Sequence, residues 1–269
     1  MLRERILSAA ILLPLVIGAL LLGGWAYTAL VSLALALAAW EYRSLLARLG
    51  YRISLILLEL GVLAWPFLFA LEREAWAMPG LFILIILTAL WQMQHYGAQA
   101  SASWALTLAG GIYLGLGGAY LIRLRAMPEG LWWSLTALPV VWIADSAAYF
   151  IGRRWGLHKM APAISPKKSW EGYGAGLVGG LLSGAALALA WHLLSGAPQL
   201  TAWRGALLGL MLAAVTPAGD FFESMFKREA GVKDSSALIP GHGGVFDRID
   251  SLLWVGWLSW LLLRLWGGN

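Results

Sequence analysis

Residues 173–195 read YGAGLVGGLLSGAALALAWHLLS and contain no charged side chain. A helix needs about 20 mainly apolar residues to cross the roughly 30 Å hydrocarbon core of a bilayer, so this stretch predicts a membrane-spanning helix. The rest of the chain is similar, since 60% of its 269 residues are hydrophobic, 12% are charged and the mean hydropathy is +0.73. An ordinary soluble domain has about 25% charged residues. We therefore expect an all-α, polytopic membrane protein.

Further apolar stretches of similar length occur along the chain. Nine of them are candidate spans, centred on residues 6–23, 25–41, 53–71, 80–94, 103–121, 131–151, 173–195, 202–219 and 251–267. The fourth and eighth are short or interrupted, which leaves counts of eight or ten open. The first follows two arginines, as in a signal peptide, but no small-residue cleavage pattern comes after it. We interpret it as a retained helix in a fold of about nine transmembrane helices.

The basic residues predict how these spans are oriented. If the N-terminus is cytoplasmic, 14 of the 19 Lys and Arg residues fall in inner segments. Cytoplasmic loops carry such an excess of positive charge. The sequence therefore predicts a multi-pass protein of the cytoplasmic (inner) membrane with its N-terminus inside and its C-terminus outside. The topology accounts for the pI near 9.6, so we expect no nucleic-acid partner.

Polar residues gather in two predicted cytoplasmic loops, 152–172 and 220–250. The first loop holds five basic residues and one acid, and the second holds six acids and four basic residues. A basic loop and an acidic loop on one side of the membrane suit an anionic substrate carried by a divalent cation. The chain has no cysteine, so a metal must be held by oxygen atoms or by histidine. Oxygen ligands favour hard cations, and Mg²⁺ is therefore the expected metal. The alternative is a pair of solvated loops.

The second loop has the spacing of a polar helix face followed by a turn. Asp220, Glu223, Ser224 and Lys227 occur at i, i+3, i+4 and i+7, which places them on one face of a continuing helix. Asp247 and Asp250 follow a turn, and this turn contains Pro240, Gly241, Gly243 and Gly244. Its glycines permit amides to converge on a phosphate. A plain connecting turn is the alternative.

Two further features lie near the first loop. Asp145 falls inside or at the end of a predicted span, where a carboxylate is costly and should face a cavity, a cation or a base. A structural ion pair with Arg153 or Arg154 is the alternative. Lys167 and Lys168 precede a helix start and could hold phosphate or a lipid headgroup; the hydroxyls beside them are Ser165 and Ser169.

One motif match fails in context. Residues 174–179, GAGLVG, fit the dinucleotide-binding fingerprint by letter, but no strand precedes them and a span contains them. We interpret these glycines as sites of close helix packing. Gly115, Gly117 and Gly118 could serve packing within the chain or a homodimer seam, and both remain open.

The segment from Ser224 to Asp250, SMFKREAGVKDSSALIPGHGGVFDRID, resembles the signature of the phosphatidate cytidylyltransferases, or CDP-diacylglycerol synthases. The stretches around Ala144–Arg153 and Ile164–Gly172 resemble the same family. The resemblance implies transfer of CMP from CTP to phosphatidic acid in phospholipid biosynthesis, with Mg²⁺ as cofactor and a second cation such as K⁺ left open. The partners would be CTP, phosphatidic acid and membrane lipids.

The residues take roles that fit this chemistry. The expected metal ligands are Asp220 and Asp247, with Asp145, Glu223 and Asp250 as further candidates. The expected catalytic residues are Asp220, Asp247, Lys227, Arg228, His242 and Arg248, where His242 donates a hydrogen bond or positions a group. The expected substrate-binding residues are Ser165, Lys167, Lys168, Ser169, Ser224, Lys233, Gly243 and Gly244. Residues 1–130 would form a scaffold with dimer or lipid contacts, and residues 131–269 the catalytic region.

Two other functions are compatible with the sequence. A magnesium transporter would also place acids in a membrane, but its acids should be strung along one pore. A CTP-dependent transferase or kinase acting on another membrane lipid is closer to the pattern. The gathering of acids beside lysines and glycines at one membrane face favours an enzyme that handles phosphate.

Overall fold

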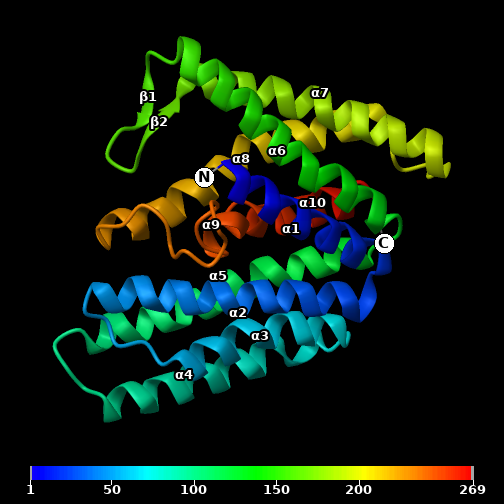
Figure 1. The fold of residues 1–269 in the computed structure, drawn as a ribbon. Helices are drawn as coiled ribbons and strands as arrows, with labels where there is room; N and C mark the ends of the chain where they lie inside the picture. Colours follow the sequence, from blue (N-terminus) through cyan, green and yellow to red (C-terminus); the bar gives the residue numbers. More distant parts are fainter. Residues whose placement is uncertain (1, 268–269) are drawn as a thin grey trace. The chain divides into compact units, whose positions relative to one another are not determined.

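The computed structural model describes residues 2–267 and is almost entirely helical (Figure 1). The helices are α1 (Leu2–Leu22), α2 (Gly24–Arg48), α3 (Leu55–Ala70), α4 (Ala77–Gln94), α5 (Ala100–Ala126), α6 (Gly130–Trp155), α7 (Trp170–Ser195), α8 (Ala202–Glu229), α9 (Phe246–Ile249) and α10 (Leu252–Leu265), with a 3₁₀ turn η1 (Glu74–Trp76). Local chemistry sets several boundaries. Gly23, at a positive φ of 64°, separates α1 from α2, and the Ser54 hydroxyl accepts the Leu57 amide at the start of α3.

Each predicted apolar stretch coincides with a helix. Within residues 2–267, seven helical segments are long and apolar enough to cross a membrane; they are Glu4–Leu22, Gly24–Arg48, Glu74–Gln94, Ala100–Ala126, Gly130–Trp155, Trp170–Ser195 and Ala202–Glu229. The helix α3 has 16 residues and α10 has 14, so both fall short of that length. The helices are confirmed, whereas the count of nine spans and the cytoplasmic N-terminus stay predictions.

A small β-hairpin corrects the all-α prediction. Strand β1 (Lys159–Ala161) pairs antiparallel with β2 (Ser165–Ser169), and Lys159 lies opposite Ser169. This loop is too polar and too rich in proline to continue a helix, so its backbone groups pair with each other instead. Ser169 ends β2 and caps α7, because its hydroxyl accepts the Gly172 amide at 3.2 Å. The hairpin thus fixes Lys167 and Lys168 directly before α7.

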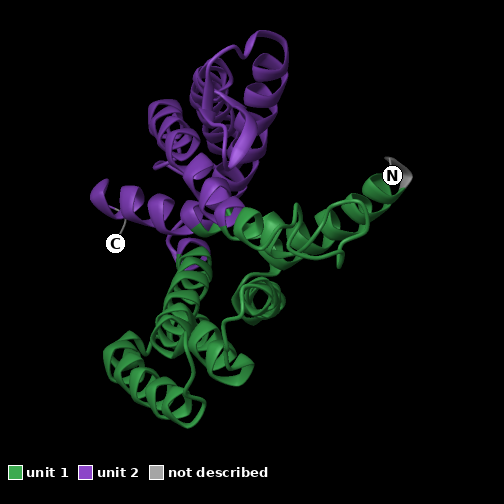
Figure 2. Ribbon diagram, turned by 90° about the vertical axis from the view of Figure 1, so that its left-hand side faces the viewer, with its two compact units in different colours: residues 1–123, 226–253 green, residues 124–225, 254–269 purple. Residues whose placement is uncertain are grey.

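The chain divides into two compact units, shown in different colours in Figure 2. One comprises residues 1–123 and 226–253, and the other residues 124–225 and 254–269. Our predicted boundary at residue 130 lies near the first break, but residues 226–253 group with the N-terminal helices. The division into scaffold and catalytic regions stays a prediction, and its outermost residues, 1 and 268–269, lie outside the described residues.

In the second unit, glycines bring helices close together. A Cβ atom added at Gly176 would lie 3.3 Å from the Ala144 carbonyl oxygen of α6, and one at Gly180 would lie 2.5 Å from the Gly209 carbonyl oxygen of α8. A larger residue would push these helices apart. The GAGLVG stretch at 174–179 is therefore part of α7 and partly serves helix packing, as its context indicates.

In the first unit, the glycines of α5 have a similar role. Added Cβ atoms at Gly115, Gly117 and Gly118 would collide with Trp65, Leu253 and Leu35, respectively. These contacts support the packing interpretation of the three glycines. A homodimer stays a prediction.

Candidate active site

In the second unit, Lys168 and Asp220 form an ion pair. β2 carries Lys168, whose Nζ lies 2.6 Å from Asp220 Oδ2 on α8 and 4.7 Å from the centre of the Phe221 ring. The Ser224 hydroxyl donates to Asp220 Oδ1 at 3.1 Å, one helical turn further along. Both oxygens of Asp220 therefore have a polar neighbour. The i, i+4 spacing of Asp220 and Ser224 that the sequence shows places them in contact.

A second carboxylate lies beside Asp220. The side chain of Glu223 is fully buried, and the two residues offer carboxylate oxygens within 4.8 Å of each other. Lys168 already lies against Asp220, and a bound cation would add positive charge between the two carboxylates. Oxygen ligands are the type that Mg²⁺ prefers. Asp220 and Glu223 therefore fit a magnesium site.

Asp145 belongs to the same unit. It is exposed on α6 and lies close enough to Lys168 and Asp220 for their charges to act on it. Among the described residues, Arg153 donates to the Tyr149 hydroxyl and Arg154 lies over the Trp155 ring, rather than pairing with Asp145. The structure thus disfavours the alternative of a structural ion pair.

In the first unit, Asp247 is the centre of a buried polar network. Its side chain is 3% exposed and that of Lys227 is 9% exposed, and Lys227 Nζ donates to Asp247 Oδ1 at 2.6 Å. Asp247 Oδ2 accepts three hydrogen bonds at 2.8 Å, from the Ser235 amide, the Ser235 hydroxyl and the Gly244 amide. Asp247, a predicted metal ligand, and Lys227, a predicted catalytic residue, are thus paired with each other.

The network determines the charge of Asp247. Burial alone would raise the pKa of Asp247, but the hydrogen bonds from Lys227 and from the Gly244 amide outweigh it, so this pKa lies below its ordinary value. The carboxylate is ionised at neutral pH. We expect the Gly244 amide to face a phosphate, but in the structure it donates a hydrogen bond to Asp247. Gly243 adopts a φ of 84° and its carbonyl accepts the Ile239 amide, which closes the turn.

Glu41 is a residue that the sequence analysis misses. It lies on α2 with 0% exposure and accepts hydrogen bonds from the Ser235 hydroxyl at 2.9 Å and the Ser236 hydroxyl at 2.5 Å. It also accepts the amides of Val245 and Phe246 at 3.0 and 2.7 Å. One carboxylate thus holds both ends of the segment 235–246, from which Asp247 follows. The signal in the sequence is an acid inside an apolar stretch, which also draws attention to Asp145.

His242 has neighbours from α1. Its Nδ1 lies 2.7 Å from the Ser8 hydroxyl oxygen, and Arg5 Nε donates to the Gly241 carbonyl at 2.8 Å. Burial, followed by the positive charges of Arg248 and Arg5, lowers the pKa of His242. The ring is therefore neutral near pH 7. A neutral ring held by Ser8 fits the positioning role that we expect.

The other candidates are spread over both units. Lys167 in the second unit and Lys233 and Arg248 in the first are exposed. Arg228 donates to the Val232 carbonyl at 2.9 Å. Asp250 is buried in the first unit, and its Oδ1 accepts the Ser251 amide at 2.6 Å. Ser165 starts β2, four residues before the capping Ser169. The roles of all these residues stay predictions.

The Glu41 network yields a stability prediction. In Glu41→Gln, the amide nitrogen of the new side chain would face donors, and at least one hydrogen bond would be lost. We expect the free energy of unfolding to fall by about 1–3 kcal/mol, the usual cost of an unsatisfied buried polar group. Thermal unfolding in detergent measures this, with the exposed Glu229→Gln as control. Equal melting temperatures for the two variants would contradict the role of Glu41.

The chain is similar in sequence to proteins of a known family. The model of the cytidylyltransferase family matches residues 3–266. A relative from Pseudomonas aeruginosa, called phosphatidate cytidylyltransferase, is 37% identical over 261 residues, which cover 94% of this chain and 93% of the relative. Relatives of the same name from Synechocystis and Mycobacterium bovis are 36% and 32% identical, covering 92% and 97% of this chain and 92% and 89% of their own lengths. The chain therefore belongs to the cytidylyltransferase family.

Proposed function

We propose that this membrane enzyme is a phosphatidate cytidylyltransferase, which transfers CMP from CTP to phosphatidic acid and releases pyrophosphate. The observation that carries the proposal is the pairing of two lysines with two carboxylates, Lys168 with Asp220 and Lys227 with Asp247. The family and the names of the relatives support the same reaction. The continuous helix α8 carries both Asp220 and Lys227.

The reaction needs positioning and charge neutralisation more than covalent help from the protein. An oxygen of the phosphatidate phosphate attacks the α-phosphorus of CTP, and the bond between this phosphorus and the bridging oxygen to the β-phosphate breaks. The electron pair leaves with pyrophosphate. A phosphate monoester has its second pKa near 6, so at neutral pH the attacking oxygen needs no strong base.

The basic residues would bind the phosphate groups. Lys167 is exposed next to the paired Lys168, so it can reach an anion without breaking an existing pair. Lys168 and Lys227 can exchange their carboxylate partners for phosphate oxygens when substrate and cation arrive together. Arg228 and Arg248 add positive charge for the triphosphate or the lipid phosphate.

The carboxylates would hold the cation. Asp220 and Glu223 fit Mg²⁺ by ligand type and proximity. We propose Asp247 as a further ligand, which would exchange some of its present hydrogen-bond partners for the cation, with Asp145 and Asp250 in support. Bound Mg²⁺ would neutralise charge on the triphosphate and on the leaving pyrophosphate. A second cation such as K⁺ is compatible with this number of acids.

The two alternative functions explain fewer of these observations. A magnesium transporter explains the acids but neither the lysines paired with them nor the family. A transferase or kinase for another lipid fits the lysine–carboxylate pairs but not the names of the relatives. Purified enzyme in detergent, given labelled CTP and phosphatidic acid, should form CDP-diacylglycerol and pyrophosphate only with Mg²⁺. Transfer of a γ-phosphate to lipid, or turnover with diacylglycerol instead, would refute the proposal.

Asp220 and Asp247 should act as a unit. An Asn at either position keeps the shape and one oxygen but removes the charge that holds a hard cation. We expect Asp220→Asn and Asp247→Asn each to lower turnover by more than about 100-fold, and the double variant to be scarcely worse than either single variant. The exposed Asp234→Asn should keep its activity. Losses that multiply independently would show that the two carboxylates serve different steps.

We further propose that the loops 152–172 and 220–250 face the cytoplasm of an inner membrane, because of the 14-to-5 distribution of basic residues. The chain has no native cysteine, so single cysteines can report the topology. Exposed Ala163→Cys and Ala237→Cys should be protected from an impermeant thiol reagent in intact cells. Ala75→Cys in η1 should react. Labelling of only one of the two loops would contradict a shared cytoplasmic side.

A further inference from the structure

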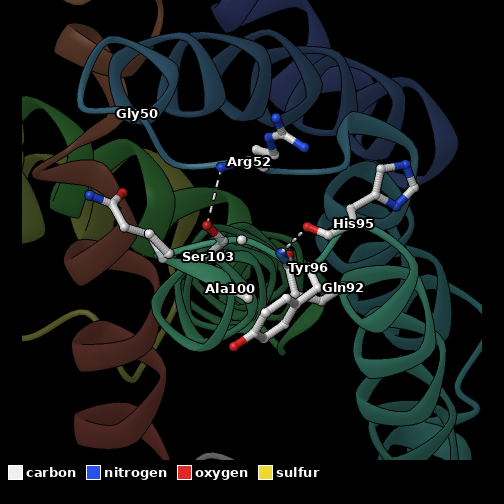
Figure 3. A pocket seen from close by; sticks show the side chains of 10 residues that line it. Gly50, Arg52, Gln92, His95, Tyr96, Ala100 and Ser103 are labelled. Atoms are coloured by element: carbon white, nitrogen blue, oxygen red, sulfur yellow. Dashed lines mark hydrogen bonds between the residues drawn. The ribbon is translucent and has the colours of Figure 1, made fainter.

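A polar cavity lies in the first unit, among residues to which the proposed reaction assigns no role. Its volume is about 280 Å³. Figure 3 shows the side chains that surround it, which come from the segment after α2, the end of α4 and the start of α5. The residues on which the argument depends are Arg52, Gln92, His95, Tyr96 and Ser103.

An apolar groove adjoins this cavity. It has a volume of about 260 Å³ and shares Gln92, Tyr96 and Ala100 with the polar cavity. Its other walls include Ala89 and Met93 of α4 and Trp104 of α5. A polar cavity that continues into an apolar groove on membrane helices has the two-part character of a phospholipid, with a headgroup at one end and acyl chains at the other.

The charge of the polar cavity favours an anion. Arg52 is the one residue with a permanent charge among the described residues that line the two spaces, and no acid is among them. The Arg52 amide donates to the buried Ser103 hydroxyl at 3.1 Å, which fixes the backbone that carries the guanidinium (Figure 3). The helix α5 starts at Ala100, so the positive end of its dipole lies at the cavity.

Gln92 points to a second property of the ligand. Its side chain is 6% exposed, and its Nε2 donates to the His95 carbonyl at 3.4 Å. Within residues 2–267, its buried Oε1 has no hydrogen-bond partner. An unsatisfied buried acceptor is costly, so it favours a ligand that brings a hydroxyl donor.

We propose that this cavity and groove bind an anionic glycerophospholipid with a hydroxyl-bearing headgroup, such as phosphatidylglycerol, at a site separate from the proposed catalytic residues. The lipid phosphate pairs with Arg52, and a headgroup hydroxyl donates to Gln92 Oε1. An acyl chain lies along the groove at Met93 and Trp104. This lipid is bound and not consumed, so the inference goes beyond the proposed reaction and its test needs no turnover.

Equilibrium binding of labelled phosphatidylglycerol to the full chain in uncharged detergent micelles tests the proposal. We expect saturable binding that is about tenfold tighter than binding of phosphatidylcholine with the same acyl chains. Arg52→Ala should weaken binding of phosphatidylglycerol by about tenfold. Arg48→Ala is the matched control, because Arg48 is exposed at the end of α2 but does not line the cavity. It should leave the affinity within about twofold of the original.

Two further arms separate a lipid from a free phosphate. Ala89→Trp should fill the groove and weaken lipid binding, while competition by soluble glycerol phosphate should stay weak in all variants. If Arg52→Ala fails to fold, Arg52→Lys replaces it and should lose part of the affinity, since lysine lacks the planar fork. Equal losses for Arg48→Ala and Arg52→Ala, non-saturable binding, or glycerol phosphate that binds as tightly as the lipid would overturn the proposal.

Discussion

The buried pair of Lys227 and Asp247 is the interaction on which the first unit's polar segment depends. Removing two charges from water is expensive unless each finds good partners, and a buried pair that loses one member becomes strongly destabilising. Here the second oxygen of Asp247 accepts hydrogen bonds from Ser235 and from the Gly244 amide, so the buried pair and the turn at 240–244 stabilise each other. The same pair gives the proposed site an ionised carboxylate and an ammonium group. Lys227 can exchange Asp247 for a phosphate oxygen of the substrate.

Glu41 extends this constraint to α2, nearly two hundred residues earlier in the chain. By accepting hydrogen bonds from Ser235 and from the Phe246 amide, it joins the start and the end of the turn segment to one long helix. In the second unit, the cap at Ser169 and the hairpin hold Lys168 in place, and Lys168 forms an ion pair with Asp220. Helices thus position the loop residues of both units, which is a common way to build a catalytic site.

The sequence predicts much of this because membranes restrict the choice of structure. Apolar stretches place the long helices, and the i, i+4 spacing places Ser224 next to Asp220. The hairpin at 159–169 escapes prediction, since short polar strands have no apolar period. The role of Glu41 is not predicted, because its partners are distant in sequence. The sequence also does not show that the Gly244 amide donates to Asp247, because the acceptor of this amide depends on how the turn folds. The helices α3 and α10, at 16 and 14 residues, are shorter than the apolar stretches from which they are predicted.

We propose that Asp220 and Asp247 hold a divalent cation for nucleotidyl transfer. Mn²⁺ substitutes for Mg²⁺ at oxygen ligands and is observed directly by electron paramagnetic resonance, which reports binding without any turnover. Titration of the purified chain with Mn²⁺ should show a saturable site in the original protein and in Asp234→Asn. In Asp220→Asn and in Asp247→Asn the affinity should fall by more than about tenfold. Unchanged Mn²⁺ binding in both of these variants would contradict the claim.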